Sequence, residues 1–596
     1  MSSVARRILK WVELPESQQG NRWTNEDLEP VPPEKQTWGV FQYVELWFLV
    51  NMNISSYQTG SSLLAVGMTW WQAIIVILIG DFFASCFAVL NSISGAKSHL
   101  GYPIVSRSVW GMWGAYFPIL NRILLSVVWY GVQAVIGGKM IYICLRSIWI
   151  DLDDRIPNTL PEKTGITTAQ FMGYVLFNLL CGALIWFKPQ QLRPYFHVGS
   201  VLVLVTMLSL LGWACGTSNG YGSVLHAPAT ISGSKLGWAM CAGIMSVIGS
   251  IAAGILNQND YTRFAKRKSQ VTWSQGIGFN VSSAIIHIVG VLVTAATQEQ
   301  YGKGEPLWDP SALFKSMQDQ GGSRARAATF FLAAVFIISQ LSINVPGNVL
   351  AGGLDVASIL PKYINLRRGA YILAILSVAP NPWQQLASGS TFLSVLSAYA
   401  VFLGPFIGLL CIHFYIIQKR QFHVTDLYTG NKTSLYWYHY GINWRTAVAW
   451  ICAVVPSLPG FLHSVNPSIK VSVHAQHLSN LSFIVGFCLA CLNAYFLHWI
   501  FPYDYDKEIF GEEIVGTSEV GAYQENVMPK AVANLLGDNG YRVQFRFRAP
   551  GIPPRCLCCT VEWCDSIDKN PQTDGLMRPE TLRWIGGNLN SEESEA

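Results

Sequence analysis

The segment SVVWYGVQAVIGG, residues 126–138, places an indole and a carboxamide in an otherwise apolar stretch. Trp129 and Gln133 are four residues apart, so on a helix they lie one turn apart on the same face. An indole stacks on a flat ring, and a carboxamide offers donors and an acceptor to the edge of that ring. An interhelical hydrogen bond and simple packing explain the same pair without a ligand. The pair therefore indicates either a site for a planar polar heterocycle or a polar contact between helices.

The environment of these two residues follows from the composition. The chain has 596 residues, of which 51% are hydrophobic and 13% are charged. Soluble domains carry roughly 25% charged residues. Apolar blocks of about twenty residues recur along the chain, and each is long enough to cross the ~30 Å hydrocarbon core as a helix. The expected fold class is an all-α polytopic membrane protein embedded in the lipid bilayer.

Hydropathy and helix breakers predict about twelve transmembrane helices. The predicted spans are residues 42–66, 70–90, 119–145, 169–187, 198–214, 236–257, 276–296, 327–352, 371–379, 386–417, 446–465 and 478–500. The ninth span is the shortest and ends in APNPW. The predicted organisation is an N-terminal segment (1–40), a ten-helix core (41–418), a loop (419–443), two additional helices (444–502) and a C-terminal tail (503–596).

Charge in the loops predicts the orientation. The loops after the sixth, eighth and tenth spans contain RFAKRKSQ, PKYINLRRGAY and QKRQFHV, whereas the basic stretch GGSRARAA precedes the eighth span. Basic loops stay in the cytoplasm, and an even number of spans leaves both termini on one side. The polar first forty residues do not resemble a cleaved signal peptide. We therefore expect both termini to be cytoplasmic.

Two spans are expected to be discontinuous. The first runs into NMNISSYQTGSS, and the sixth carries small residues from Gly249 to Gly254. Interrupted helices at matching places in two halves of a chain point to the central site of a transporter. Close packing of helices through small residues is the alternative for the sixth span.

The sequence favours a carrier over other classes. It contains no nucleophile elbow, phosphate loop or metal quartet in its core, so neither an enzyme, a bound metal nor a cofactor is expected. The net charge of +5 is dispersed, which excludes a nucleic-acid partner. A channel or membrane receptor is the competing class, but the polar groups gather in the first, third, sixth and eighth spans, as in an occluded site.

Several motifs carry a family resemblance between Asn21 and Tyr503. These motifs include NRWTNEDLEPVPPEKQTWG, GYPIVSRSVWGMWGAYFPILNR, VVWYGVQAVIGG, NQNDYTRFAK and INVPGNVLAGGLDVASILPKYINLRRG. Together they resemble the fungal uracil/allantoin/uridine permease branch of the nucleobase–cation symporter family. The resemblance implies a five-plus-five inverted-repeat core of the leucine-transporter type with two added C-terminal helices. It also implies a plasma-membrane symporter that rocks a helix bundle against a scaffold.

The resemblance also implies a set of substrate-binding positions. Trp129 and Gln133 match the family's third-helix motif. A bacterial hydantoin transporter of that family has a glutamine and an asparagine where this chain has Asn53 and Asn348. Where the family has glycine, glycine and tryptophan in the sixth helix, this chain has Gly249, Ser250 and Ile251. The implied substrate-binding residues are Trp129, Gln133, Asn348, Asn53, Ser250 and Ile251. Tyr57 or Tyr261 is the expected replacement for the missing aromatic wall.

The driving ion is predicted from a departure from the family. The residues aligned with the family's sodium site are Leu49, Met52, Ser339, Ser342 and Ile343. Ile343 replaces a hydroxyl, and a hard cation such as sodium needs a full set of oxygen ligands. A proton needs only a carboxylate whose pKa can be raised by burial. Proton symport is therefore predicted rather than sodium symport.

Acidic residues inside spans are the candidates for proton coupling or gating, because charges in a membrane are rare and usually functional. Glu45 is the first candidate for the proton carrier and Asp81 the second. The family resemblance makes Asp355 a gate element or a structural anchor, with Arg263 as one partner to consider. Lys139 is expected to extend its side chain toward the membrane surface.

Uracil or allantoin is the leading substrate class, and uridine and thiamine-type vitamins are the alternatives. The tail is expected to be disordered, because few apolar residues there could form a core. Its cysteines, Cys556, Cys558, Cys559 and Cys564, could be palmitoylated or hold zinc. Lys530 and nearby acids suit trafficking or ubiquitylation machinery.

Overall fold

The computed structural model describes residues 13–15, 21–161, 164–187, 189–217, 229–466 and 468–503. The chain divides into two compact units, Met1–Glu512 and Glu513–Ala596, and the described residues belong to the first. The predicted tail, its cysteines and Lys530 lie outside the described residues. Within these residues the chain is helical, with two isolated β-bridges.

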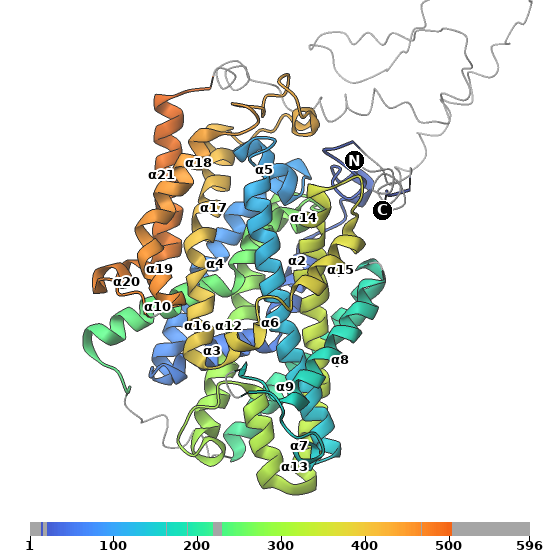
Figure 1. The fold of residues 1–596 in the computed structure, drawn as a ribbon, viewed down its shortest axis with the longest axis vertical. Coiled ribbons are helices and arrows are strands. Elements are labelled where there is room, and N and C mark those ends of the chain that lie inside the picture. Colours follow the sequence, from blue (N-terminus) through green and yellow to red (C-terminus); the bar gives the residue numbers. More distant parts are fainter. Residues whose placement is uncertain are drawn as a thin grey trace, which may run out of the picture. The chain divides into compact units, whose positions relative to one another are not determined.

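The helices follow one another in the order expected from hydropathy (Figure 1). The first half comprises α2 (Val40–Asn51), α3 (Ile54–Ala65), α4 (Trp70–Ser98), α5 (Tyr102–Trp110), α6 (Tyr116–Ile148), α7 (Leu152–Arg155), α8 (Thr168–Ile185) and α9 (Pro189–Thr217). The central part comprises α10 (Gly233–Leu256), α11 (Gln258–Thr262), α12 (Lys268–Gly302), α13 (Pro310–Ile343), η5 (Asn344–Leu350), α14 (Ala351–Ile359) and α15 (Leu366–Leu376). The last part comprises η6 (Pro382–Leu386), α16 (Gly389–Ala398), α17 (Ala400–Ile412), η7 (His413–Ile417), α18 (Trp444–Val454), α19 (Leu458–Val465), α20 (Val473–Ser479) and α21 (Ser482–Ile500).

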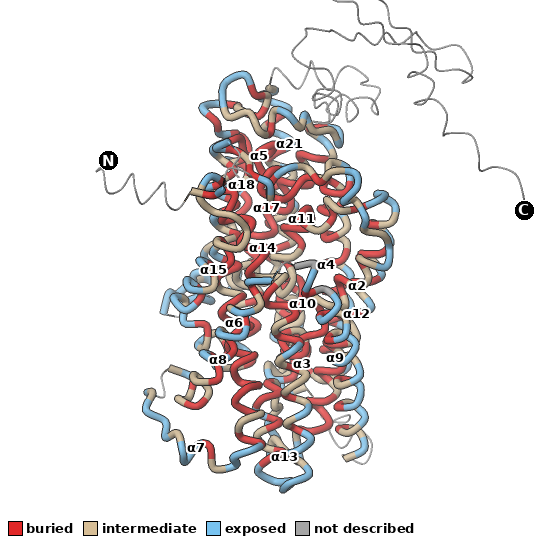
Figure 2. The backbone as a smooth tube through the Cα atoms, turned by 90° about the vertical axis from the view of Figure 1, so that its right-hand side faces the viewer, coloured by how far each residue is buried: buried red, intermediate tan, exposed pale blue. Residues whose placement is uncertain are grey.

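Ten helices among the described residues are long and apolar enough to cross a membrane. The first predicted span consists of the two half-helices α2 and α3, and the ninth is the 11-residue helix α15. The first and ninth spans, which contain no long helix, account for the difference between ten long helices and twelve predicted spans. Buried backbone follows the central helices, and exposed positions lie on loops and outer faces (Figure 2).

The break in the first span is where the sequence predicts it. Helix α2 ends at Asn51, and Asn53 caps the start of α3 by accepting a hydrogen bond from the backbone N–H of Ser56 at 3.1 Å. A capping side chain satisfies one of the donors that every helix start leaves open. The polar residues of this segment therefore serve the broken backbone directly.

The predicted interruption of the sixth span is wrong in its position. Helix α10 is continuous through Gly249 and Gly254 and ends only at Leu256, before the short helix α11. The small residues allow close packing instead, since a methyl group at Gly249 would lie 2.1 Å from the carbonyl oxygen of Leu396. Asn91 of α4 donates to the carbonyls of Ile255 and Leu256 at 2.7 and 2.9 Å, which satisfies the end of α10.

Contacts between helices separate two groups. Helices α2, α3, α4, α10, α11 and α12 pack mainly on one another, and we call this group the bundle. Helices α6, α8, α13, α14 and α15, with η5, form a second group, which we call the scaffold. Helices α17, α18 and α21 pack together beside the bundle.

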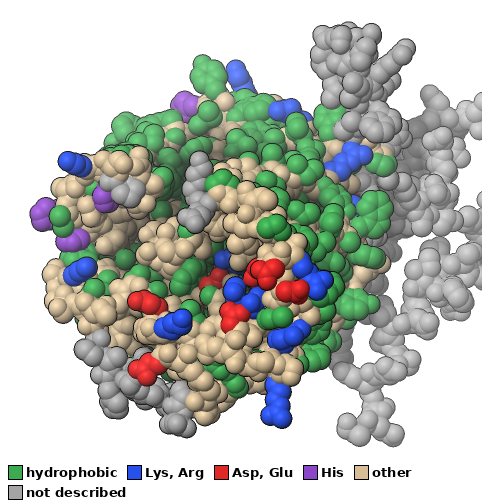
Figure 3. Space-filling view, turned by 60° about the horizontal axis from the view of Figure 1, so that its bottom comes forward, with side chains coloured by type: hydrophobic (Ala, Val, Ile, Leu, Met, Phe, Trp, Pro, Cys, Tyr) green, Lys and Arg blue, Asp and Glu red, His purple; other side chains and the backbone are tan. Residues whose placement is uncertain are grey.

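The N-terminal segment and the basic loops meet at one end of this unit. The backbone N–H of Trp38 donates to the carbonyl of Phe264 at 2.9 Å, and that of Leu366 donates to the carboxylate of Asp27 at 3.0 Å. The hydroxyl of Tyr428 donates to the carbonyl of Leu28 at 2.9 Å. We call this end the α5 end. The opposite end, the α7 end, holds α7 and the start of α13 (Figure 1). Figure 3, in which this second end comes forward, shows acidic and basic side chains side by side on it.

Candidate functional site

One cavity lies between the bundle and the scaffold. Its empty volume is about 890 Å³, including the space that opens to solvent. Its walls come from α2, α3, α10, α11 and α12 on one side and from α6 and η5 on the other, with Ile343 at the end of α13. All the predicted substrate-binding residues line it: Trp129, Gln133, Asn348, Asn53, Ser250 and Ile251.

Helix α6 supplies one continuous wall of the cavity. Arg122, Ser126, Trp129 and Gln133 recur at helical spacing, so they lie on one face. From Arg122 to Gln133 this face is about 16 Å long, since a helix rises 1.5 Å per residue. None of the described α6 residues beyond Gln133 lines the cavity. The cavity therefore occupies the half of the molecule nearer the α5 end.

The amide of Gln133 is held from both sides. Its Nε2 donates to the hydroxyl of Ser55 at 2.8 Å, and its Oε1 accepts from Nε2 of Gln340 at 2.9 Å. The side chain of Gln133 is buried in the wall. The predicted polar contact between helices is thus present, and Gln133 still lines the cavity. The polar contact between helices therefore leaves Gln133 on the cavity wall.

Asn348 reaches the cavity from an irregular turn. The segment η5 is a π-helix that contains Pro346, which has no N–H and cannot continue the α-helical hydrogen-bonding pattern. Asn348 donates to Oδ1 of Asn344 at 2.9 Å, and Asn344 donates to the carbonyl of Tyr130 at 3.3 Å. This turn places Gly347 and Asn348 on the cavity wall.

Of the two tyrosines expected to replace the missing aromatic wall, one lines the cavity. Tyr261 lines the cavity, whereas Tyr57 points into the core and contacts the hydroxyl of Thr294 at 3.2 Å. Burial raises the pKa of the Tyr261 phenol, so it stays protonated and can donate. Trp47 also lines the cavity, and its Nε1 has no hydrogen-bond partner among the described residues. Trp47 was not predicted from the sequence, because it is one apolar residue in an apolar helix.

Both serines aligned with a sodium site donate their hydroxyl protons to backbone carbonyls. The hydroxyl of Ser339 donates to the carbonyl of Met52 at 2.7 Å, and that of Ser342 donates to the carbonyl of Ile338 at 2.8 Å. Of the five residues aligned with the sodium site, only Ile343 lines the cavity, and Leu49 does not. Both hydroxyls are therefore engaged within the protein.

Asp81 lies directly behind the cavity wall. Its carboxylate accepts from the hydroxyl of Ser283 at 2.8 Å and lies 3.4 Å from Nδ1 of His287. Asp81 is buried, and both Ser283 and His287 line the cavity. His287 was not identified from the sequence, although an ionisable residue inside the apolar segment SSAIIHIVG is itself a signal. Glu45 instead contacts His197 of α9, away from the cavity.

Asp355 is paired with Arg122. The guanidinium of Arg122 contacts the carboxylate of Asp355 and donates to the carbonyl of Ala351 at 3.3 Å. Arg122 lines the cavity, and Asp355 is fully buried behind it. Arg263, which was considered as a partner, donates instead to the carbonyl of Asp27 at 3.1 Å.

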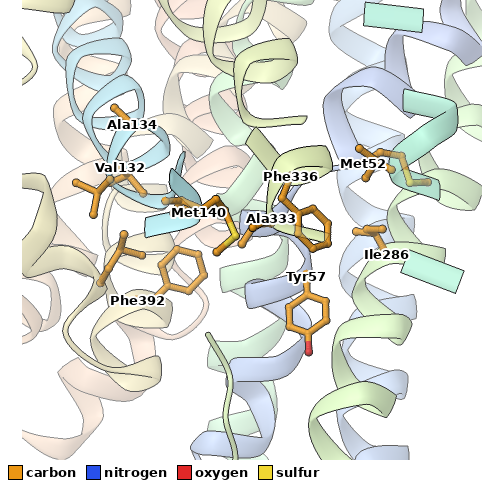
Figure 4. Packing of buried hydrophobic residues seen from close by; sticks show 14 of the residues in the cluster. Met52, Tyr57, Val132, Ala134, Met140, Ile286, Ala333, Phe336 and Phe392 are labelled. Carbon is orange, nitrogen blue, oxygen red and sulfur yellow. The ribbon is translucent and has the colours of Figure 1, made fainter. Parts of the chain in front are cut away.

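The half of the molecule nearer the α7 end is closed by packing. Tyr57, Phe336 and Met140 are fully buried, and Figure 4 shows them packed from α3, α13 and α6. Lys139 does not extend to the surface as expected, because its ammonium binds the carboxylate of Asp309 at 2.8 Å. Burial alone would raise the pKa of Asp309, but Lys139 and a hydrogen bond from Ser311 hold it below its usual range.

A helical membrane protein with one polar cavity between two helix groups has the construction of a carrier. The family described as permease for cytosine/purines, uracil, thiamine and allantoin matches residues 30–486. The chain belongs to this family. The uracil permease of Saccharomyces cerevisiae is 34% identical over 486 residues, which cover 80% of this chain and 76% of that permease. The allantoin permease of the same yeast is 34% identical over 487 residues, with the same coverage.

The fold agrees with this assignment. Mhp1, a nucleobase-cation-symport-1 family transporter, in a closed conformation with bromovinylhydantoin bound, matches with a TM-score of 0.64 at 19% identity. The match covers 81% of this chain and 98% of Mhp1. The inward-facing conformation of Mhp1 gives a TM-score of 0.63 at 17% identity. These matches confirm the expected leucine-transporter-type fold, and the relatives are transporters rather than enzymes.

Proposed function

We propose that this chain imports a small planar heterocycle of the uracil or allantoin type across the plasma membrane by proton symport. The observation that carries the proposal is the presence of Trp129, Gln133 and Asn348 on the walls of one cavity. An indole face and two amides are the groups that stack on a flat ring and bond its edge. The yeast relatives named uracil permease and allantoin permease support this substrate class.

Larger substrates are the second candidates. Relatives named uridine permease and thiamine transporter are 33% and 30% identical to this chain. Ile251 lines the cavity where the family pattern has a tryptophan, so it leaves room beside the ring. Competition of unlabelled uracil, allantoin, uridine and thiamine against one labelled substrate ranks the candidates.

The geometry also supports the direction of access. We take the α5 end as cytoplasmic, because the N-terminal segment and the basic loops meet there. The cavity occupies the half nearer this end, and packed side chains fill the other half. This arrangement corresponds to an inward-facing state of a carrier that moves the bundle against the scaffold.

Proton coupling is favoured by the loss of one side-chain oxygen. Ile343 offers no side-chain oxygen where the family's sodium site has a hydroxyl, and the hydroxyl of Ser339 donates its proton to the carbonyl of Met52. Asp81, behind His287, is a buried carboxylate beside the cavity, and it replaces Glu45 as our first choice of proton carrier. Burial and a histidine neighbour are the features that tune a carboxylate for proton exchange.

The test is uptake of radiolabelled uracil by cells that lack their own permeases. Saturable uptake that rises as external pH falls, and that is unchanged when choline replaces sodium, is the expected result. A Glu45→Gln variant should keep the pH response. Non-saturating flux would favour a channel, and sodium-dependent uptake without a response to protonophore would exclude proton symport.

A further inference from the structure

We propose that Gln340 is a positioning residue that fixes the orientation of the Gln133 amide and so determines substrate specificity. This inference rests on the proposed function. Gln340 belongs to α13, is fully buried and does not line the cavity. Its Nε2 donates to Oε1 of Gln133 at 2.9 Å. Gln340 therefore acts on a substrate only through Gln133.

The orientation of Gln133 follows from a chain of hydrogen bonds that begins at the backbone. The N–H of Ser56 can only donate, so the side-chain atom of Asn53 that it contacts at 3.1 Å must be the oxygen. The hydroxyl of Ser55 contacts the same oxygen at 2.6 Å and must therefore donate to it. A hydroxyl that donates there accepts elsewhere, so Gln133 presents Nε2 to Ser55 and Oε1 to Gln340.

The Asn53 end of this series of hydrogen bonds agrees with the same orientation. The amide nitrogen of Asn53 contacts the carbonyl of Val50 at 2.6 Å, and a carbonyl can only accept. Two backbone groups at the break of the first span thus fix the orientation of the Asn53 amide, and through the rotatable hydroxyl of Ser55 they favour the same orientation of Gln133. Ser55 holds the Gln133 amide from the bundle, and the hydrogen bond from Gln340 holds it from the scaffold.

The consequence concerns the ring edge that the cavity accepts. One N–H of Nε2 and one lone pair of Oε1 of Gln133 are already engaged within the protein, so one N–H and one lone pair remain. The remaining N–H of Nε2 requires an acceptor on the substrate, and the remaining lone pair of Oε1 requires a donor. Adjacent carbonyl and N–H groups, as at C4 and N3 of uracil, meet this order. With the ring held in the same pose against Trp129, cytosine presents the reverse order at the same two positions, an amino donor and a ring acceptor.

Without Gln340 this preference weakens. Once the donor on the scaffold side is removed, the Gln133 amide can turn over when the Ser55 hydroxyl redirects its proton from Asn53 to Oε1 of Gln133, because Oδ1 of Asn53 still accepts from the N–H of Ser56. The turned amide accepts the cytosine pattern. A structural role of Gln340 alone would weaken uracil and cytosine binding equally, so the ratio of the two affinities separates the two roles.

The test uses Gln340→Met, which keeps the length of the side chain and removes its donor. The ratio of the inhibition constants of cytosine and uracil against labelled uracil uptake is measured for the wild-type protein and the variant. We expect this ratio to fall about tenfold, the effect of one hydrogen bond of about 1.4 kcal/mol. Gln275→Met, a matched substitution of a buried glutamine in α12 that does not line the cavity, should leave the ratio unchanged.

A second measurement does not depend on transport. The melting temperatures of purified wild-type protein, Gln340→Met, Gln133→Met and the double variant form a cycle. The double variant should melt above the temperature that additivity predicts, because the second substitution removes a bond that is already lost. Wild-type protein that transports neither uracil nor allantoin refutes the proposed function, and the cycle then tests the hydrogen bond between Gln133 and Gln340 alone. An additive cycle or an unchanged affinity ratio in transport-competent Gln340→Met overturns the inference.

Discussion

The ion pair between Arg122 and Asp355 gives the sharpest prediction about stability. Both side chains are buried, with 3% and 0% of their surfaces exposed, but their surroundings differ. Arg122 lines the cavity, so water can reach a guanidinium that has lost its partner. Asp355 has no such access, and its Oδ1 has no hydrogen-bond partner among the described residues. Replacing Arg122 alone and replacing Asp355 alone should therefore lower the free energy of unfolding by unequal amounts.

Arg122→Met leaves a carboxylate buried and unpaired, which costs about 3–5 kcal/mol of the free energy of unfolding. Asp355→Asn removes the charge, leaves a neutral polar group and frees a guanidinium that the cavity can hydrate, at a cost of about 1–3 kcal/mol. The double variant Arg122→Met/Asp355→Leu removes both charges and should be more stable than Arg122→Met alone.

Thermal unfolding of the purified variants in detergent at neutral pH measures this order. The melting temperature should be lowest for Arg122→Met. Equal melting temperatures for the two single variants, or a double variant that melts below Arg122→Met, would refute the reasoning. Because both residues belong to the scaffold, the pair joins two helices of one group, which favours an anchor over a gate for Asp355.

Three further predictions test the site and its surroundings. Gln133→Ala and Asn348→Ala should reach the cell surface yet lose high-affinity uptake, because each removes ring-edge hydrogen bonds of about 1–3 kcal/mol; surface labelling and saturation kinetics check this. Asp81→Asn should abolish the response of uptake to external pH, and a retained response would exclude Asp81 as proton carrier. Lys139 holds the pKa of Asp309 below its usual range, so the ionised carboxylate of Asp309 stabilises the folded state above about pH 4. This contribution to the free energy of unfolding is lost as the pH falls further. The difference in melting temperature between the wild-type protein and Asp309→Asn should thus be constant from pH 8 to pH 5 and narrow below about pH 4.

The order of the spans and the cavity residues could be predicted from the sequence for different reasons. Long apolar blocks identify helices in lipid locally, without knowledge of their neighbours. The break at Asn53 is also local, because the residues that satisfy the broken backbone lie beside it. Trp129 and Gln133 required the family resemblance as well, since a polar residue in a helix can serve packing or a ligand equally.

Contacts between distant segments were not predictable in the same way. The continuity of α10 depends on Leu396, which packs on Gly249, and small residues alone do not distinguish packing from unwinding. The partner of Lys139 is Asp309, 170 residues away, and spacing along one helix cannot reveal it. Sequence patterns show that a charge in a span needs a partner, but they do not show which one.

The break in the first helix links the fold to the recognition of a substrate. A broken helix leaves backbone groups that lipid cannot satisfy, so polar side chains must meet them. Asn53 meets the carbonyl of Val50 and the N–H of Ser56, and Ser339 meets the carbonyl of Met52. Asn53 also lines the cavity, with part of its hydrogen-bonding capacity already used. Under the proposed function, a heterocycle would meet the remaining capacity of the cavity amides, and Gln340, outside the cavity, would control which ring is accepted by holding Gln133.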